Sequence, residues 1–351
     1  MNTIYIIDIE PVETRYTAQW QKYTPILLNV KLGHKYNIKN ISSNIQSATV
    51  TTPGAFLNFS ATNTYKSDQG LQIFDLFETN QIKDGDIFLF TDAWNPIIIQ
   101  LKYIIDLNKI DAKIIGLWHA GSYDPYDFLG RLIQNKEWSY NFERSVFHAI
   151  DINCFATEFH IELFKTVLEI DDDKKILRTG WPMEYLNHEL DNYKNIKKEN
   201  IILFPHRIAP EKQLYIFKDL EKQLPQYQFI VAQEKKLTKH EYHTLLGKSK
   251  IVFSASLQET LGITMYEGAI LNAIPIVPNR LSYLEMYPMD YKYPSNWTED
   301  FDNYSIFKDD ITYLLDKVMT DYDTLKLSLP TLVQTLNDNF FSFNVLINKL
   351  K

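Results

Sequence analysis

The sequence of 351 residues lacks the features that mark secreted and membrane-spanning proteins. Its single cysteine, Cys154, excludes an internal disulfide framework, fits a reducing compartment and is expected to be a buried small hydrophobe rather than a nucleophile. No apolar run approaches the roughly 20 residues that cross a bilayer. The opening "MNTIYIIDIEPVE" lacks the basic start of a signal peptide. We therefore expect a cytoplasmic protein without integral membrane contact.

An excess of positive charge is also missing, since the net charge is −8 at pH 7. Residues 1–186 hold 17 Lys and Arg against 23 Asp and Glu, and the remainder holds 19 against 21. Neither half has the basic character of a nucleic-acid clamp, although Lys31, Lys35 and Lys39 form a small local stripe.

The sequence does contain short apolar runs that alternate with segments of helical spacing. Continuous apolar strands between helices indicate parallel sheets that are covered on both faces. The runs fall into two groups, which predict an α/β protein of two Rossmann-like, doubly wound domains. The expected strands are 4–8, 86–91, 113–118, 154–157, 201–205, 228–232, 250–255 and 274–278, and the expected helices include 94–107, 158–168, 211–224 and 263–272.

A polar, charged stretch separates the two groups. We expect a first domain at 1–186, a linker at 187–200 and a second domain at 201–325. Residues 326–351 have helical spacing, and either end the second domain or pack back on the first. Because ligands of open parallel sheets bind beyond the carboxyl ends of the strands, the residues that follow each strand are the site candidates.

Two glutamates bracket the expected start of a helix in "SASLQETLGITMYEGA". Glu259 precedes Gly262 in the loop, and Glu267 follows it on the helix. The helix N-terminus offers unpaired N–H groups to an anion, and the two carboxylates could hold sugar hydroxyls on either side of it. The spacing alone favours ordinary solvent-exposed residues.

A second cluster follows the strand at 201–205. In "FPHRIAPEKQ", Arg207 and Lys212 come at the mouth of this strand and just before another helix. Two cations there suit a diphosphate, although paired surface cations are common.

Together and in this order, residues 201–280 resemble the donor-binding half of retaining GT-B glycosyltransferases, especially family 4. That family has Arg-x4-Lys, matched by Arg207 and Lys212, and Glu-x7-Glu with a central glycine, matched by Glu259, Gly262 and Glu267. It also has a "P-I/V-V" strand after a small-residue segment, matched by "GAILNAIPIVP".

The resemblance implies a GT-B fold, in which two Rossmann-like domains face a central cleft. It also implies that Arg207 and Lys212 hold the donor diphosphate, Glu259 contacts the donor sugar and Glu267 contacts the ribose. The backbone of the donor loop, Thr260, Leu261 and Gly262, would meet the phosphates.

The first half departs from the family because it has no glycine between Asp8 and Gly33, where a glycine-rich turn is usual. If 4–8 is the first strand, Glu13, Thr14 and Arg15 still lie at the cleft, and Arg15 is the candidate phosphate or acceptor contact. A helix-capping cluster is an equal alternative.

Strand-end residues in the first half supply further candidates. The family often places a histidine near the transferred sugar after the strand matched by 113–118, which makes His119 a catalytic candidate together with Arg207, Lys212 and Glu259. A structural role is the alternative for His119, as for most lone histidines. Asp124 and Asp127 follow on the acceptor side. Asp92 and Trp94 have the same strand-end position, and Trp94 either stacks on a ligand or packs in the core.

The segment "DGD" at 84–86 imitates a metal-binding Asp-x-Asp signature, but its position predicts a turn that enters a strand. No Cys/His cluster predicts zinc. We expect no metal requirement and no permanently bound cofactor, only a nucleoside-diphosphate sugar as co-substrate, with a UDP-sugar favoured.

The resemblance implies a retaining transfer of a hexose or pentose from that donor to a hydroxyl. One acceptor is 5-hydroxymethylcytosine in DNA, as in enzymes of large phages, which would place the protein in the host cytoplasm. The other is a cell-surface or lipid-linked glycan. A nucleotide-sugar 2-epimerase and a non-catalytic nucleotide-sugar-binding protein are alternatives, and the sequence leaves the oligomeric state open.

Overall fold

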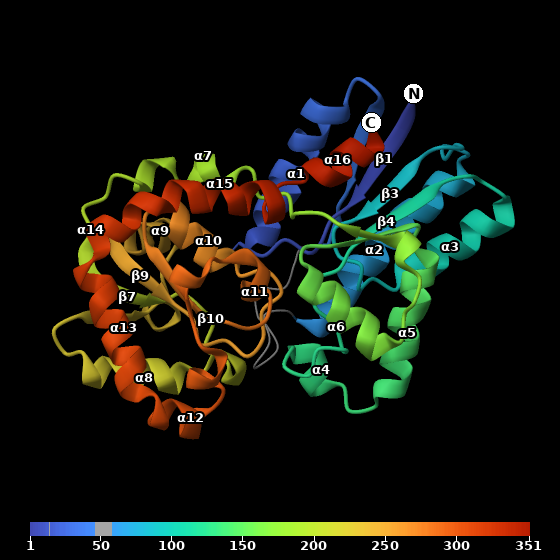
Figure 1. The fold of residues 1–351 in the computed structure, drawn as a ribbon. Helices are drawn as coiled ribbons and strands as arrows, with labels where there is room; N and C mark the ends of the chain where they lie inside the picture. The colour runs from blue at the N-terminus through green and yellow to red at the C-terminus, as the bar shows by residue number, and fades with distance from the viewer. Residues whose placement is uncertain (14, 46–57) are drawn as a thin grey trace. The chain divides into compact units, whose positions relative to one another are not determined.

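The computed structural model describes residues 1–13, 15–45 and 58–351. The chain divides into two compact units (Figure 1). Unit 1 comprises residues 1–182 and 343–351, and unit 2 comprises residues 183–342. Thr14, one of the predicted strand-end residues, lies outside the described part of the chain.

Unit 1 is built on a parallel sheet in the order β2-β1-β3-β4-β5-β6. The strand order reverses at β1, as in doubly wound folds. All four strands predicted for the first half are confirmed, whereas β2 and β6 were not predicted. The strands are β1 (Asn2–Ile7), β2 (Tyr36–Ile41), β3 (Ile87–Phe90), β4 (Lys113–Leu117), β5 (Ile152–Phe155) and β6 (Ile176–Arg178).

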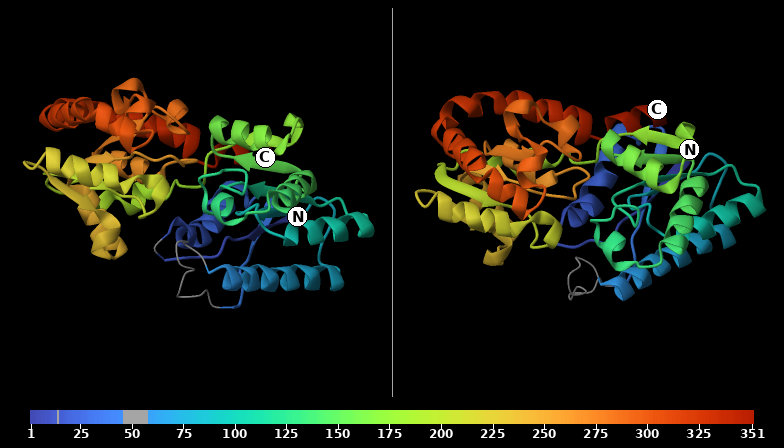
Figure 2. Two further views of the ribbon diagram at one scale, coloured as in Figure 1. Left: turned by 90° about the horizontal axis from the view of Figure 1, so that it is seen from below. Right: turned by 60° about the horizontal axis from the view of Figure 1, so that its bottom comes forward.

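The helices of unit 1 pack in two groups. The long α2 contacts α3, which contacts α5, which in turn contacts α6, and Figure 2 shows α2 beside α3. In the second group α1 contacts α16, and Figure 1 shows these two helices side by side. The helices are α1 (Tyr16–Leu32), α2 (Phe59–Glu78), α3 (Ile97–Asn108), α4 (Phe128–Leu132), α5 (Lys136–Ala149), α6 (Glu158–Leu168) and α16 (Asn344–Leu350), with the 3-10 turn η1 (Asp173–Lys175).

Large aromatic side chains fill the core of unit 1. Phe88 and Phe90 of β3 and Phe155 of β5 are fully buried, and Phe155 packs against Phe164 of α6. Cys154 precedes Phe155 in β5 and is 1% exposed, and burial raises the pKa of its thiol well above the ordinary value. The buried thiol therefore fits a packing role.

Unit 2 is built on a second parallel sheet, in the order β11-β10-β9-β7-β8. Its four predicted strands are confirmed, and the two-residue β11 was not predicted. The strands are β7 (Glu199–Phe204), β8 (Gln228–Val231), β9 (Ser249–Phe253), β10 (Ile274–Pro278) and β11 (Lys292–Tyr293).

The helices of unit 2 also form two groups: α10 contacts α9 and α15, whereas α13 contacts α8 and β9. The helices are α7 (Leu186–Glu189), α8 (Leu214–Gln223), α9 (Lys239–Lys248), α10 (Ile263–Ile270), α11 (Tyr283–Met286), α12 (Phe301–Ile306), α13 (Lys308–Thr320), α14 (Tyr322–Leu325) and α15 (Leu329–Phe340). The 3-10 turns are η2 (Asp191–Tyr193), η3 (Pro210–Lys212), η4 (Ala232–Lys235), η5 (Met289–Tyr291), η6 (Ser295–Thr298) and η7 (Lys326–Ser328).

Two segments that the sequence left between domains have definite positions. The stretch 187–200 lies within unit 2, where it carries most of α7, then η2 and the start of β7, because Leu186 and Leu190 anchor it at 2% and 0% exposure. The segment 326–351 divides: α15 stays in unit 2, and α16 belongs to unit 1. Lys35 fastens α16 to unit 1 by donating to the carbonyl of Leu350 at 3.0 Å.

Candidate functional site

The predicted donor-binding residues lie at the carboxyl ends of two neighbouring strands of unit 2. Strands β7 and β9 are hydrogen-bonded to each other. Arg207 and Lys212 follow β7, Glu259 lies in the loop between β9 and α10, and Glu267 lies on α10. The fold therefore brings the two sequence motifs, some 50 residues apart, to one edge of one sheet.

Hydrogen bonds tie the two loops at this edge together. The backbone N–H of Leu257 donates to the carbonyl of Glu211 at 2.8 Å. The buried side chain of Gln213 donates to the carbonyl of Ala255 at 2.7 Å. Neither Glu211 nor Gln213 was singled out from the sequence, because the bonds they make depend on the pairing of β7 with β9.

Lys212 and Glu259 form an ion pair at the centre of this edge. The Nζ of Lys212 lies 3.3 Å from Oε2 of Glu259, and the two side chains are 7% and 19% exposed. Lys212 also donates to the carbonyl of Gln258. Burial opposes ionisation of Glu259, but the charge of Lys212 and the N–H of Gly262 outweigh it and hold the pKa below the ordinary value. Glu259 is therefore a carboxylate at neutral pH.

Gly262 is the N-cap residue of α10 and has a left-handed backbone, with φ of 71°. A Cβ at this position would lie 2.7 Å from a ring carbon of Tyr283, so a larger residue would be strained and would clash. The Gly262 N–H donates to Oε1 of Glu259 at 2.9 Å. Thr260 and Leu261, the rest of the predicted donor loop, are 7% and 1% exposed. In this structure the Gly262 N–H, which we expected to bind a phosphate, is therefore already hydrogen-bonded to the Glu259 carboxylate.

Arg207 is oriented by a carboxylate four residues later in the chain. Its guanidinium pairs with Oε1 of Glu211, with Nε at 3.2 Å, and the side chains are 31% and 1% exposed. Burial opposes ionisation of Glu211, but the bonds and charge of Arg207 lower its pKa below the ordinary value. Glu211 therefore fixes Arg207 at the mouth of β7.

Glu267 lies on the first turns of α10 and faces α9. Its carboxylate accepts a hydrogen bond from the hydroxyl of Tyr242 at 3.3 Å. Burial raises the pKa of Glu267 to about 7, with Glu189 adding to the rise and Lys239 opposing it. The group therefore changes charge near neutral pH, which its position in the sequence did not suggest.

His206 was missed by the sequence interpretation, although it lies directly before Arg207. It is 5% exposed, its ring packs edge-on against Phe204, and burial lowers its pKa to about 3. Within the described part of the chain, its buried Nε2 has no hydrogen-bond partner.

In unit 1, His119 follows β4 and uses both ring nitrogens. Its Nε2 lies 2.7 Å from the carbonyl of Thr91, and its Nδ1 lies 2.9 Å from the hydroxyl of Tyr16. A carbonyl can only accept, so Nε2 carries the proton and Nδ1 accepts from Tyr16. Burial lowers the pKa of His119 although Asp92 opposes the change, so the imidazole is neutral at neutral pH.

Aromatic side chains enclose His119. The ring centroids of Trp20 and Trp181 lie 5.5 and 4.5 Å from that of His119. Both indoles are buried, and over residues 1–13, 15–45 and 58–351 their N–H groups have no hydrogen-bond partner. These residues gave no signal in the sequence, because isolated tryptophans usually pack in a core.

The predicted residues of the first loop surround the start of α1. Glu13 is exposed, and Arg15 is the N-cap residue of α1 without a side-chain capping bond. The guanidinium of Arg15 lies 5.5 Å from the ring centroid of Tyr16, and its charge contributes to lowering the pKa of His119. Arg15 thus lies in the His119 cluster.

The position of the missing glycine-rich turn is filled by a buried carboxyl group, Asp8, directly after β1. It accepts from the hydroxyl of Tyr65 and the side-chain amide of Gln69, both at 2.7 Å, and from Gln21 at 2.9 Å. Burial raises the pKa of Asp8 despite these bonds. An internal hydrogen-bond network therefore shapes this strand end.

Asp92 and Trp94, which follow β3, are held by other parts of unit 1. Lys66 of α2 lies 2.8 Å from Oδ2 of Asp92. The indole N–H of Trp94 donates to Glu143 at 2.9 Å, and its ring packs 4.7 Å from that of Phe142. These contacts hold the partly buried ring of Trp94 against α5.

The remaining acidic candidates of unit 1 shape turns. Asp124 accepts the N–H of Tyr126 at 2.9 Å, and Asp127 caps α4 through the N–H of Leu129 at 3.0 Å. The segment 84–86 is the turn before β3, as predicted, and Asp86 accepts the N–H of Thr3 at 2.7 Å. Among the residues that the structure describes, no three or more His, Cys, Asp or Glu side chains are grouped so as to hold a metal.

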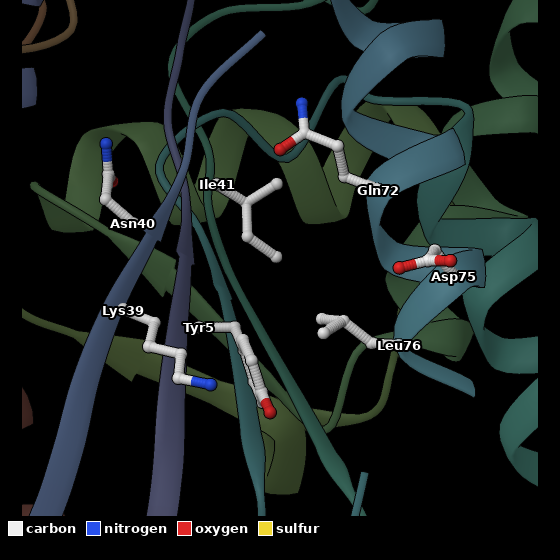
Figure 3. A pocket seen from close by; sticks show the side chains of 7 residues that line it. All are labelled: Tyr5, Lys39, Asn40, Ile41, Gln72, Asp75 and Leu76. Carbon is white, nitrogen blue, oxygen red and sulfur yellow. The ribbon is translucent and has the colours of Figure 1, made fainter. Parts of the chain in front are cut away.

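A pocket of about 290 Å³ opens in unit 1 between α2 and the strands β1 and β2 (Figure 3). None of the predicted site residues lines it. Its lining consists of Tyr5, Lys39, Asn40, Ile41, Gln72, Asp75 and Leu76.

In the described part of the chain, no helix is long and apolar enough to cross a membrane.

Comparison with known proteins gives structural matches only. No protein-family model and no curated protein matches the sequence. Sucrose-phosphate synthase from Thermosynechococcus elongatus is similar at 10% identity and a TM-score of 0.64, covering 99% of this chain and 97% of its own. The catalytic domain of starch synthase IV from Arabidopsis thaliana, bound to ADP and acarbose, is 11% identical with a TM-score of 0.60, over 99% and 97%.

A third match is HepE from Anabaena, in complex with UDP and glucose, at 10% identity and a TM-score of 0.58, over 99% of this chain and 98% of that one. Each similarity extends over both units. With its two parallel-sheet, Rossmann-like units, the chain has the GT-B fold.

Proposed function

We propose that the chain is a glycosyltransferase that uses a nucleoside-diphosphate sugar, with a UDP-sugar as the favoured donor. One observation carries the proposal. Two cations, Arg207 and Lys212, and the amide of Gly262 at the N-terminus of α10 meet at the mouths of the paired strands β7 and β9. The proposal is supported by the fold, because structurally similar proteins were solved with UDP or ADP.

The arrangement is suited to stabilising a leaving diphosphate. Negative charge grows on the diphosphate as the glycosidic bond breaks, and positive charge grows on the sugar ring. Lys212, Arg207 and the N-terminus of α10 oppose the first charge, which is electrostatic stabilisation of the transition state. Because Lys212 is almost fully buried, its charge acts with little screening by water.

Glu259 has to exchange partners when the donor binds. Its carboxylate now holds both the Gly262 N–H and Lys212. A diphosphate carries more charge than a carboxylate and competes for the same donors. We infer that Glu259 then turns to the donor sugar, where it accepts from hydroxyls and opposes the positive charge of the ring.

We propose retention of the anomeric configuration by front-face attack. In this mechanism the departing phosphate takes the acceptor's proton, so no side-chain nucleophile is needed. His119 contributes as a neutral hydrogen-bonding group near the transferred sugar, and Glu267 binds the ribose. Both ring nitrogens of His119 are bound, to Thr91 and Tyr16, so this role requires His119 to exchange one of these partners for the sugar.

For the acceptor we propose the hydroxyl of 5-hydroxymethylcytosine in DNA, with a glycan hydroxyl as the competing acceptor. The composition, rich in Ile, Asn, Lys and Tyr, fits an AT-rich genome, whether of a phage or of a bacterium. The stripe of Lys31, Lys35 and Lys39 gives little support for DNA binding. The amine of Lys35 donates to the carbonyls of Leu350 and Lys351, at 3.0 and 2.7 Å.

The test is mass spectrometry of hydroxymethylated DNA and, separately, of a glycan mixture, after incubation with UDP-glucose, UDP-GlcNAc or ADP-glucose. A mass gain of one sugar residue of the donor on the base establishes DNA glycosylation, and a gain only on glycans shows that a glycan is the acceptor. A Lys212→Met variant is the control for chemistry at this site. Donor isomerisation without acceptor indicates an epimerase, and no change in any donor or acceptor contradicts a transferase.

A further inference from the structure

The buried histidine at the mouth of β7 has a polar atom without a use in the folded chain. His206 is 5% exposed, and in the part of the chain that the structure describes its Nε2 makes no hydrogen bond. Buried polar atoms are nearly always paired, so an unpaired one suggests a partner that is not part of the chain.

The surroundings of His206 identify the kind of partner. It follows β7, directly before Arg207, and its electrostatic neighbours are Lys212, Glu259 and Arg207. Two of these three are the cations at the mouths of β7 and β9, and the third is the carboxylate that holds the Gly262 N–H. The imidazole therefore lies in the same electrostatic environment as the groups that attract an anion.

The protonation state of His206 suits donation to an anion without adding a buried charge. Burial, reinforced by Lys212 and opposed by Glu259, lowers its pKa to about 3, so the free protein holds a neutral ring. A neutral imidazole has one N–H and one acceptor nitrogen. An anionic oxygen that approaches Nε2 favours the tautomer with the N–H on that nitrogen.

We propose that His206 is a further donor-binding residue, whose Nε2–H donates a hydrogen bond to an oxygen of the donor's diphosphate. This inference rests on the proposed function, since it requires that a nucleoside diphosphate binds at the mouths of β7 and β9. It adds a neutral donor to the two cations and the helix N-terminus. The diphosphate is favoured over the sugar because both cations, Arg207 and Lys212, are electrostatic neighbours of His206.

Calorimetry with three ligands separates the phosphates from the nucleoside and the donor sugar. UDP, uridine and UDP-glucose are titrated into the full chain and into its His206→Phe and His206→Gln variants. Phe keeps a ring against Phe204 but removes the N–H, whereas Gln keeps an N–H close to the position of Nε2. Thr312→Val is the matched control, because it also removes an unpartnered buried polar atom, but from α13 of the same unit.

We expect the affinities of His206→Phe for UDP and UDP-glucose to fall by at least about tenfold, the loss expected for a hydrogen bond to a charged group, while uridine binding is unchanged. His206→Gln should recover most of the loss, and Thr312→Val should bind as the wild type does. Equal UDP affinity in wild type and His206→Phe, a loss confined to UDP-glucose, or an equal loss for uridine would each overturn the assignment.

A measurement on the unaltered protein covers the case in which a variant does not fold. With 15N-labelled histidine, the Nε2 resonance of His206 should shift when UDP is added and stay in place with uridine. An unmoved resonance at saturating UDP contradicts the proposal while leaving the transferase function intact. If the wild type binds none of UDP, ADP and GDP, the proposed function itself fails, and the role of His206 with it.

Discussion

Replacing Lys212 by methionine should destabilise unit 2 and allow the coupling energy between Lys212 and Glu259 to be measured. Methionine keeps most of the lysine's apolar stem but removes the charge. The carbonyl of Gln258 then loses a donor, and Glu259 keeps the Gly262 N–H but loses its ion pair with Lys212. Because the side chains are only 7% and 19% exposed, breaking the pair should cost about 3 kcal/mol, at the low end for a buried pair.

The assay is urea unfolding of the full chain followed by circular dichroism, with hydrogen–deuterium exchange to assign the transition to unit 2. The double variant Lys212→Met with Glu259→Gln should recover part of the loss, with a coupling of about 1–3 kcal/mol between the two sites. Lys218→Met is the control: its pair with Glu234 is 3.1 Å long but 38% and 43% exposed, and should cost less than about 1 kcal/mol.

The pH dependence gives a second check with a definite sign. The folded pKa of Glu259 is lowered, so its stabilisation is complete above its unfolded pKa and is lost as pH falls through the folded value. The difference in free energy of unfolding between the wild type and Lys212→Met should therefore become smaller in acid, below about pH 4. Strictly additive single variants, or a difference that does not change with pH, would refute the reasoning.

Other predictions concern α10. Gly262→Ala should destabilise the protein by about 2 kcal/mol or more, because φ of 71° is strained for alanine and Tyr283 blocks its Cβ; an unchanged melting temperature would contradict this. Glu267 has a folded pKa raised to about 7, so stability should fall by up to about 2 kcal/mol as pH rises from about 4.5 to 7, and Glu267→Gln should flatten that slope in pH-dependent urea unfolding. Glu267→Ala should weaken UDP binding by about 1–3 kcal/mol in calorimetry, and unchanged affinity would exclude its ribose role.

The sequence predicted the sheets because the central strands are continuous apolar runs. The strands that it missed lack this signal. β2 (Tyr36–Ile41) lies at the sheet edge with three of its six residues polar, and β11 has only two residues. The long α2 was also missed, since its polar segment "ATNTYKSDQG" hides the buried face formed by Tyr65, Gln69 and Ile73.

Only part of the candidate site could be predicted from the sequence, for a different reason. Motif spacing placed Arg207, Lys212 and Glu259 on the correct elements, but it could not show that Glu259 would take the Gly262 amide for itself. That contact depends on how the loops after β7 and β9 meet. His206 gave no signal at all, because a single histidine after a strand has no partner pattern in the sequence.

The return of α16 to unit 1 has a consequence for biosynthesis. Leu346 and Ile347 are buried at 0% and 1% exposure, and Lys35 binds the carbonyl of Leu350. During translation, all of unit 2 is synthesised before α16, so unit 1 still lacks this helix. The side of α1 that α16 covers in the folded protein stays exposed until then. The amino-terminal unit, although made first, is therefore the last to be completed, and nascent chains arrested before residue 343 should expose an apolar patch to chaperones.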